Sequence, residues 1–333
     1  MITDARALRQ RFIPQELVHR DGEVDVLTNA LEPLAKGDIG EDLLITGPSG
    51  VGKTSTTKHV LNDLERQTLD IETAYVNCIS ANSPTGALAT LVRDTGRSAP
   101  LDPRGGIQAN LVESLRQLDG TLVAVLDEAD VLEDKGLIHT LYELPHVTLV
   151  LITVTADDLF MNADIRVTNR LRSFHPLEFD AYTHQELMDI LAHRADVGLH
   201  PNALGDGVLN EMADIAAGNA RLGIALLRRA AKRCQTMRQP TITTDTITAV
   251  HGSARKEIAS RYVDKLGTDQ RLLYEIIAEH ETIEPEPLYQ TYEDRASDPN
   301  ARRTLRNYLA AMRRENLIEK TGAGPTTRYR TTT

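Results

Sequence analysis

Gly47-Pro48-Ser49-Gly50-Val51-Gly52-Lys53-Thr54 is the stretch that decides the fold, because it fits the G-x-x-x-x-G-K-[ST] phosphate-binding loop at every specified position. Residues 42–46 before it predict a short buried strand, and residues 55–65 after it have the composition of a helix. A strand, a glycine-rich loop and a helix in this order are the context that the motif requires. Nucleotide binding, with ATP or ADP as ligand, is therefore the first hypothesis.

The residue types of this loop explain how it would hold a nucleotide. Its glycines let the backbone turn and approach oxygen atoms, so that successive N–H groups and the helix N-terminus face an anion. We predict that Lys53 reaches the β- and γ-phosphates and that the Thr54 hydroxyl binds Mg²⁺. All eight loop residues and Ser55, the next residue of the helix, are predicted to bind the nucleotide.

A second acidic element should complete the metal site. Residues 121–130 form an apolar run that ends in Asp127, Glu128 and Asp130, which is typical of a Walker B strand. Asp127 at the carboxyl end of a parallel strand can hold Mg²⁺, and Glu128 can orient or deprotonate the attacking water. The two motifs together predict a nucleoside triphosphatase with catalytic Lys53, Asp127 and Glu128.

Composition places the chain among soluble multidomain proteins. It has 333 residues, a formal net charge of −11, no Trp, and no apolar run long enough to cross a membrane. We therefore expect a cytoplasmic protein without a membrane partner. Only 8 of its 37 basic residues are Lys, and such an acidic, Lys-poor surface suits concentrated salt, although a GC-rich genome would also favour Arg.

Five strand-like segments alternate with helical segments in the first 180 residues: 42–46, 74–78, 121–127, 146–155 and 174–179. That alternation predicts an α/β domain with a parallel sheet over residues 1–180. Residues 181–250 read as a helical lid, and residues 1–12 as a loose arm. A Pro- and Gly-rich loop is expected at 99–106.

The last segment, residues 251–333, has a different pattern. Three helices are predicted at 269–280, 287–296 and 300–316, followed by short strands at 317–320 and 327–331, which is typical of a winged helix. From Arg295 onward there are nine basic and three acidic residues, a charge balance that favours double-stranded DNA as partner. A winged helix that binds protein is the alternative. The predicted DNA-binding residues are Arg302, Arg303, Arg306, Arg313, Arg328 and Arg330.

With these motifs in place, nearly the whole chain resembles the archaeal origin-recognition and cell-division-control initiators, a family of AAA+ ATPases that end in a winged helix. Residues 13–23 are similar to the family's helix-entry motif near the adenine pocket, and residues 126–130 to its Walker B box. Residues 217–221 resemble the sensor 2 motif of its lid. The resemblance implies an AAA+ phosphate-loop fold, ATP-dependent origin binding, and Arg20 and Arg221 as further nucleotide-binding residues.

The same resemblance implies catalytic arginines and protein partners. Arg221 would touch the γ-phosphate from the lid. Arg166 and Arg170 lie where the family carries its arginine finger, which serves a neighbouring subunit, and Arg170 fits the general position better. The implied partners are origin DNA, a replicative helicase and neighbouring initiator subunits, in association with the nucleoid.

One position departs from the family pattern. The sensor 1 position, usually a polar Asn, falls on Ala156, and alanine cannot orient water. Thr155 or Asp157 could substitute after a shift of one residue; otherwise the sequence predicts slow hydrolysis. Two other functions remain open: a signalling ATPase whose winged helix binds protein, and a transcription regulator that uses the same parts.

Overall fold

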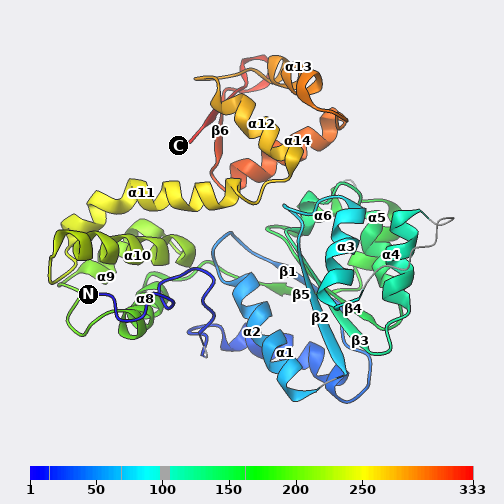
Figure 1. Ribbon diagram of the computed structural model, residues 1–333, viewed down its shortest axis with the longest axis horizontal. Helices are drawn as coiled ribbons and strands as arrows, with labels where there is room; N and C mark the ends of the chain where they lie inside the picture. The colour runs from blue at the N-terminus through cyan, green and yellow to red at the C-terminus, as the bar shows by residue number, and fades with distance from the viewer. Residues whose placement is uncertain (15, 69, 98–105, 162, 333) are drawn as a thin grey trace.

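A parallel five-stranded sheet forms the centre of the computed structural model, which describes residues 1–14, 16–68, 70–97, 106–161 and 163–332. The strand order is β2-β3-β4-β1-β5, as an α/β domain with crossover helices requires (Figure 1). The strands are β1 (Leu43–Thr46), β2 (Ile71–Asn77), β3 (Thr121–Asp127), β4 (Val147–Ile152) and β5 (His175–Glu178). All five predicted strands are confirmed, and β2 begins three residues earlier than expected.

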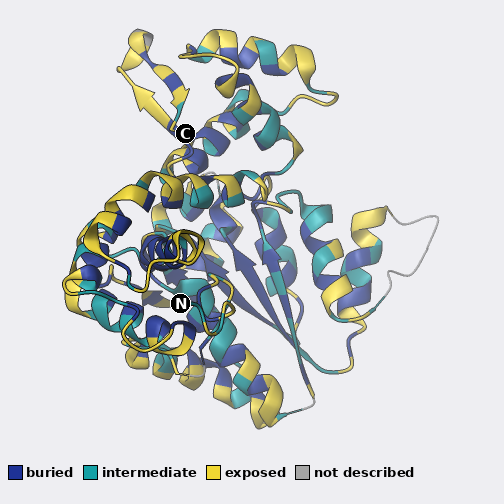
Figure 2. Cartoon of the chain, turned by 60° about the vertical axis from the view of Figure 1, so that its left-hand side comes forward, coloured by how far each residue is buried: buried dark blue, intermediate teal, exposed yellow. Residues whose placement is uncertain are grey.

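Alternate residues of each central strand enter two separate cores. In β3, Val123 and Val125 pack with α1 (Asp21–Ala35) and α2 (Lys53–Gln67), whereas Leu122 and Leu126 pack on the opposite face. The helices on that second face are α3 (Pro84–Asp94), α4 (Ile107–Arg116), α5 (Gly136–Tyr142), α6 (Ala156–Phe160) and α7 (Ile165–Leu171). Figure 2 shows the central strands buried between these layers, so β3 and β4 can be apolar on both faces, whereas the edge strand β5 is mostly exposed.

Strand register brings the carboxyl ends of the central strands to one edge of the sheet. Asp127, the last residue of β3, is paired with Asn77 of β2 and Ile152 of β4. The phosphate loop leaves β1 at the same edge, where ligands gather in open α/β sheets. The predicted loop at 99–106 falls almost entirely outside the described residues.

The helical lid follows β5 as predicted. It contains α8 (His184–Gly198), α9 (Val208–Ala216) and α10 (Ala220–Met237). Thr183 and Glu186 form a capping box at the start of α8. The expectation of a loose N-terminal arm is wrong: Leu8 is buried in the lid core, and Arg194 donates hydrogen bonds to the carbonyls of Ala7 and Phe12.

A long helix, α11 (Thr244–Val263), connects the lid to the last domain (Figure 1). It continues through residue 250, where we placed the domain boundary. The remaining elements are α12 (Thr268–Ala278), α13 (Pro285–Arg295), α14 (Arg302–Arg314), β6 (Ile318–Thr321), the 3-10 turn η2 (Gly324–Thr326) and β7 (Arg328–Thr331). Strands β6 and β7 are antiparallel, and Ile283 adds an antiparallel bridge to Tyr329. Three helices and this small sheet form the predicted winged helix.

The winged helix packs against the sheet domain through α14. The Tyr308 hydroxyl donates to Glu133 Oε1 at 2.8 Å and accepts from Asn82 Nδ2 at 2.8 Å. Arg314 is ion-paired with Asp130, which lies in the 3-10 turn η1 (Ala129–Val131), and its Nη1 lies 2.7 Å from Asp158 Oδ2 in α6. One face of α14 is therefore fixed to the edge of the sheet that carries the phosphate loop.

In the part of the chain that the structure describes, no helix is both long enough and apolar enough to cross a membrane.

Candidate nucleotide site and DNA interface

The phosphate loop turns tightly between β1 and α2. Gly50 has φ +84° and Gly52, the N-cap of α2, has φ +99°, a region that favours glycine. A Cβ on Gly50 would lie 2.1 Å from Asn219 Oδ1, so the loop and the lid approach too closely for any side chain there. The Gly50 carbonyl also accepts a hydrogen bond from Ala220 N, which makes the first residue of α10 a direct contact of the loop.

Lys53 extends along this loop at the start of α2. Its Nζ donates to the carbonyls of Gly47, at 2.5 Å, and Pro48, at 2.8 Å. Burial lowers the pKa of Lys53, while the carboxylates of Glu128 and Asp127 act in the opposite direction. The ammonium group thus lies between the loop and the Walker B acids.

Asp127 is the meeting point of three elements. Its Oδ2 accepts hydrogen bonds from Thr54 Oγ1 at 2.7 Å and from the Tyr75 hydroxyl at 2.5 Å, and its Oδ1 accepts from Glu128 N at 3.0 Å. Thr54 and Asp127, the two predicted metal ligands, are thus brought together. A hydroxyl and a carboxylate are hard oxygen donors of the kind that Mg²⁺ takes, so the donor set fits this metal. Sequence reasoning missed Tyr75.

Glu128 follows Asp127 in a left-handed conformation, with φ +57°. Burial raises the pKa of Glu128 to about 8, and the negative charges of Asp127, Glu315 and Asp130 add to the increase. A carboxyl group with such a pKa is suited to exchange a proton near neutral pH.

Arg221 joins the phosphate loop to the winged helix. Its Nη1 donates to Ser49 Oγ at 3.1 Å and to Glu315 Oε2 at 2.9 Å. Glu315 is the C-cap of α14, and its side chain is only 4% exposed. The other oxygen of that carboxylate, Oε1, is buried and has no hydrogen-bond partner among the residues that the structure describes. Sequence reasoning missed Glu315, because no motif around it indicates this contact.

Arg20 is buried between the sheet and the lid. Its Nη2 donates to the carbonyls of Val51, at 2.9 Å, and Asp180, at 2.8 Å, and its guanidinium lies 4.0 Å from the centre of the Tyr182 ring. These contacts fix the loop to the segment that leads into the lid. As a nucleotide ligand Arg20 stays a prediction.

The polar residue at the end of β4 is Thr153. Its buried hydroxyl donates to Asp130 Oδ1 at 3.0 Å. Ala156 comes three residues later as the first residue of α6, and Thr155 caps that helix through Asp158. The Thr155 hydroxyl is therefore engaged as the N-cap of α6. Asp157, the other substitute that we considered, lies exposed in the first turn of α6.

The two candidate fingers lie on α7. Arg170 donates to Glu143 Oε1 at 3.2 Å and stacks on Tyr142, with 4.6 Å to the ring centre. Arg166 pairs with Asp164 at 3.1 Å. Both side chains are exposed, and among the described residues their ion-pair partners are Asp164 and Glu143 rather than the phosphate loop.

The six predicted DNA-binding arginines differ in whether a carboxylate partner neutralises them. Three of them form ion pairs with glutamates: Arg302 with Glu286 and Glu293, Arg328 with Glu284, and Arg330 with Glu319. Arg306 and Arg313 are exposed and have no carboxylate partner among the described residues. Arg303 lies close enough to Lys135 to affect its pKa.

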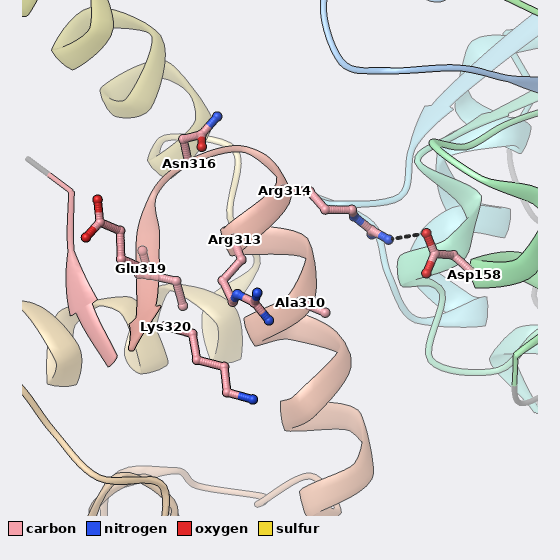
Figure 3. A pocket seen from close by; sticks show the side chains of 8 residues that line it. Asp158, Ala310, Arg313, Arg314, Asn316, Glu319 and Lys320 are labelled. Atoms are coloured by element: carbon pink, nitrogen blue, oxygen red, sulfur yellow. Dashed lines mark hydrogen bonds and ion pairs between the residues drawn. The ribbon is translucent and has the colours of Figure 1, made fainter. Parts of the chain in front are cut away.

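A cavity of about 530 Å³ opens beside Arg313. It lies between α14, β6 and α6, and Lys320, Arg314 and Asp158 line it too (Figure 3). Lys320 was not among the predicted DNA-binding residues. Its position next to Arg313 extends the basic face from the helix to the hairpin.

Fold and site together define an AAA ATPase. A model of the AAA ATPase domain matches residues 16–152, and a model of the Cdc6 AAA+ ATPase-type lid domain matches residues 188–256. The chain is 37% identical to ORC1-type DNA replication protein 9 of Halobacterium salinarum, over 99% of this chain and 93% of that protein. The chain therefore belongs to the ORC1-type DNA replication protein family.

Solved structures agree on the fold. The Aeropyrum pernix ORC1 protein in complex with DNA matches with a TM-score of 0.75 and 23% identity, over 99% of this chain and 93% of that chain. The ORC2 protein of the same organism, solved as ADPNP-ADP complexes, matches with a TM-score of 0.67 and 23% identity, over 99% and 94%. The Halobacterium relative also accords with the salt-adapted composition expected from the sequence.

Proposed function

We propose that this chain is a replication initiator that binds double-stranded origin DNA through its winged helix and changes state with ATP. The observation that carries the proposal is the position of Arg221, whose guanidinium contacts both the phosphate loop and Glu315 of the winged helix. Membership of the ORC1-type family supports the origin role, and the DNA complex of the A. pernix ORC1 protein supports DNA as partner.

The nucleotide site has the groups that ATP hydrolysis needs. Lys53 and the N–H groups of the loop bind phosphate oxygens, and Thr54 and Asp127 would hold Mg²⁺. Bound Mg²⁺ neutralises charge on the phosphates during the displacement. Glu128 orients the attacking water and takes its proton. With Ala156 at the sensor 1 position, one polar group for that water is missing, so we expect slow turnover.

The switch follows from competition for Arg221. A γ-phosphate and the Glu315 carboxylate are both anions that a guanidinium binds strongly, and Arg221 has one guanidinium to offer. In the conformation described here, Glu315 takes that position. ATP would draw Arg221 toward the loop and weaken the contact that fixes α14, whereas ADP, which lacks the γ-phosphate, would leave it in place.

We assign the primary DNA face to Arg306, Arg313 and Lys320. Within the described part of the chain, none of these cations has a carboxylate partner that must be displaced before it binds phosphate, in contrast to Arg302. The proposal extends to a neighbouring initiator subunit that receives Arg170, to a replicative helicase, and to association with the nucleoid.

Fluorescence anisotropy with labelled duplex DNA over a range of salt concentrations tests the proposal. Arg306→Ala and Arg313→Ala should each lower the slope of log K against log salt by about 1. Arg166→Ala, an exposed arginine on the sheet domain, is the matched control and should leave the slope unchanged. Wild-type affinity should also differ between ADP and a non-hydrolysable ATP analogue. Equal slopes in all variants would refute the DNA face, and equal affinities with both nucleotides would refute the switch.

A further inference from the structure

Three arginines pair with a single carboxylate where α10 meets α11, and two further cations lie near these arginines. We call these five cations and their carboxylate, Glu257 of α11, the lid cluster. Among the described residues, no other carboxylate forms an ion pair with these cations. The cations come from the N-terminal arm, α10 and α11: Arg9, Arg228, Arg229, Lys232 and Arg261. The formal charge of the lid cluster is +4, from five positive charges and one negative charge, in a chain of net charge −11.

Three arginines share the Glu257 carboxylate. Arg229 Nε lies 2.6 Å from Oε2, Arg261 Nη2 lies 2.9 Å from Oε1, and Arg228 is paired with Oε1 as well. Arg228 is buried, and its Nε has no hydrogen-bond partner among the described residues. A carboxylate has about four lone-pair positions, whereas each guanidinium has five N–H donors. The donors of the lid cluster therefore exceed what Glu257 can accept.

A purely structural role explains only part of this arrangement. The Arg228–Glu257 pair suffices to hold α10 to α11, and Arg261 also binds Gln10 of the arm at 3.3 Å. The additional cations reach the surface: Arg9 and Lys232 are exposed, and the side chain of Arg229 is 38% exposed. Exposed like charges repel one another unless an anion joins them.

The position of the lid cluster indicates the kind of anion. Its exposed cations, Arg9 and Lys232, come from two different segments of the chain, which suits an extended polyanion, and a duplex carries one charge per about 1.7 Å of its axis. Glu257 precedes the last residue of α11 by six positions, which is roughly 9 Å along the helix. The winged helix follows directly after α11 (Figure 1). The lid cluster therefore lies only about 9 Å, measured along α11, from the end of the helix that leads into the winged helix.

We propose that the lid cluster is a second contact for the phosphate backbone of the DNA duplex that the winged helix binds. This inference depends on the DNA binding proposed above. Arg229, Lys232 and Arg9 contact phosphates, and Arg228 with Glu257 keeps α10 and α11 in the geometry that presents them. The contact is independent of base sequence, because it involves the backbone only.

The test compares two double variants in the same salt-dependent anisotropy assay. Arg229→Ala with Lys232→Ala removes two cations of the lid cluster and leaves the Arg228–Glu257 pair. Arg233→Ala with Lys256→Ala removes two exposed cations outside the lid cluster, one from α10 and one from α11, and serves as the control. We expect the slope of log K against log salt to fall by about 2 in the first variant and to stay unchanged in the second. Unchanged thermal unfolding should accompany both.

The outcomes separate this inference from the proposed function. If the lid variant behaves like its control while Arg306→Ala and Arg313→Ala lower the slope, the inference fails and the proposed function stands. If the wild-type protein shows no salt-dependent DNA binding, both fail. If the lid variant changes sedimentation but not DNA binding, the lid cluster binds the acidic surface of a second copy, and the inference is overturned.

Discussion

Replacing Glu315 by glutamine tests the proposed competition for Arg221 most directly. The substitution keeps the size of the side chain and an oxygen that can accept from Arg221, but it removes the negative charge. Glu315 Oε2 lies 2.9 Å from Arg221 Nη1, and the two side chains are 4% and 32% exposed. Because Ser49 also accepts from Arg221, the guanidinium keeps a partner in the variant.

The size of the effect follows from this geometry. A hydrogen bond to a charged group contributes about 1.5–3 kcal/mol, and breaking a fully buried ion pair costs about 3–5 kcal/mol. The lower range applies here, because about one third of the Arg221 side chain reaches solvent and water screens the lost charge. Since about 1.4 kcal/mol corresponds to a factor of ten, we expect the ATP analogue to bind roughly 10- to 100-fold more tightly to Glu315→Gln than to the wild type.

Titration calorimetry with a non-hydrolysable ATP analogue and with ADP measures this effect. The affinity for ADP should change far less, because ADP lacks the phosphate that competes with Glu315. Glu319→Gln is the matched control: it removes a carboxylate of the same domain that pairs with Arg330 at 2.6 Å but is 48% exposed. The reasoning is refuted if Glu315→Gln leaves the ratio of the two affinities within about twofold of the wild type.

The remaining predictions concern the nucleotide site and its neighbours. Lys53→Ala should weaken nucleotide binding by about 10- to 100-fold through loss of a charge-assisted hydrogen bond, whereas Lys58→Ala on the same helix should not; equal losses would contradict the role of Lys53. Arg170→Ala should lower ATP turnover by at least about tenfold, and only at protein concentrations where subunits assemble, whereas Arg166→Ala should not. A loss that is independent of concentration would argue against a finger in trans. Ala156→Asn should raise turnover by about tenfold with nucleotide affinity unchanged, and an unchanged rate would show that this position does not limit hydrolysis.

Local motifs explain why much of the fold could be predicted from the sequence. In the phosphate loop and the Walker B strand, the chemistry depends on residue types at fixed spacing, and the strands beside them are continuous apolar runs. The same holds for α14, where Leu305, Leu309 and Met312 recur at helical spacing and are buried. Each of these features depends only on residues that are close together in the sequence.

The missed features depend on residues that are far apart in the chain. Glu315 is separated from Arg221 by 94 positions, and Tyr75 from Asp127 by 52. Nothing in the residues around either one indicates such a partner. The buried arm was missed for the same reason, because Leu8 becomes a core residue only through the lid that covers it. Charge counting also overestimated the availability of Arg302, whose two glutamate partners lie on α13.

Helix α14 would connect the two proposed activities, ATP binding and DNA binding, because its faces have different partners. Tyr308, Arg314 and Glu315 contact the sheet domain and Arg221, whereas Arg306 and Arg313 of the same helix are exposed. A helix of 13 residues is about 20 Å long and moves as one body, so a change at Glu315 displaces the basic face as well. Thermodynamic linkage then requires reciprocity: if ATP changes the affinity for DNA by some factor, DNA must change the affinity for ATP by the same factor. A duplex that binds the proposed DNA face should therefore alter how tightly the phosphate loop holds its nucleotide.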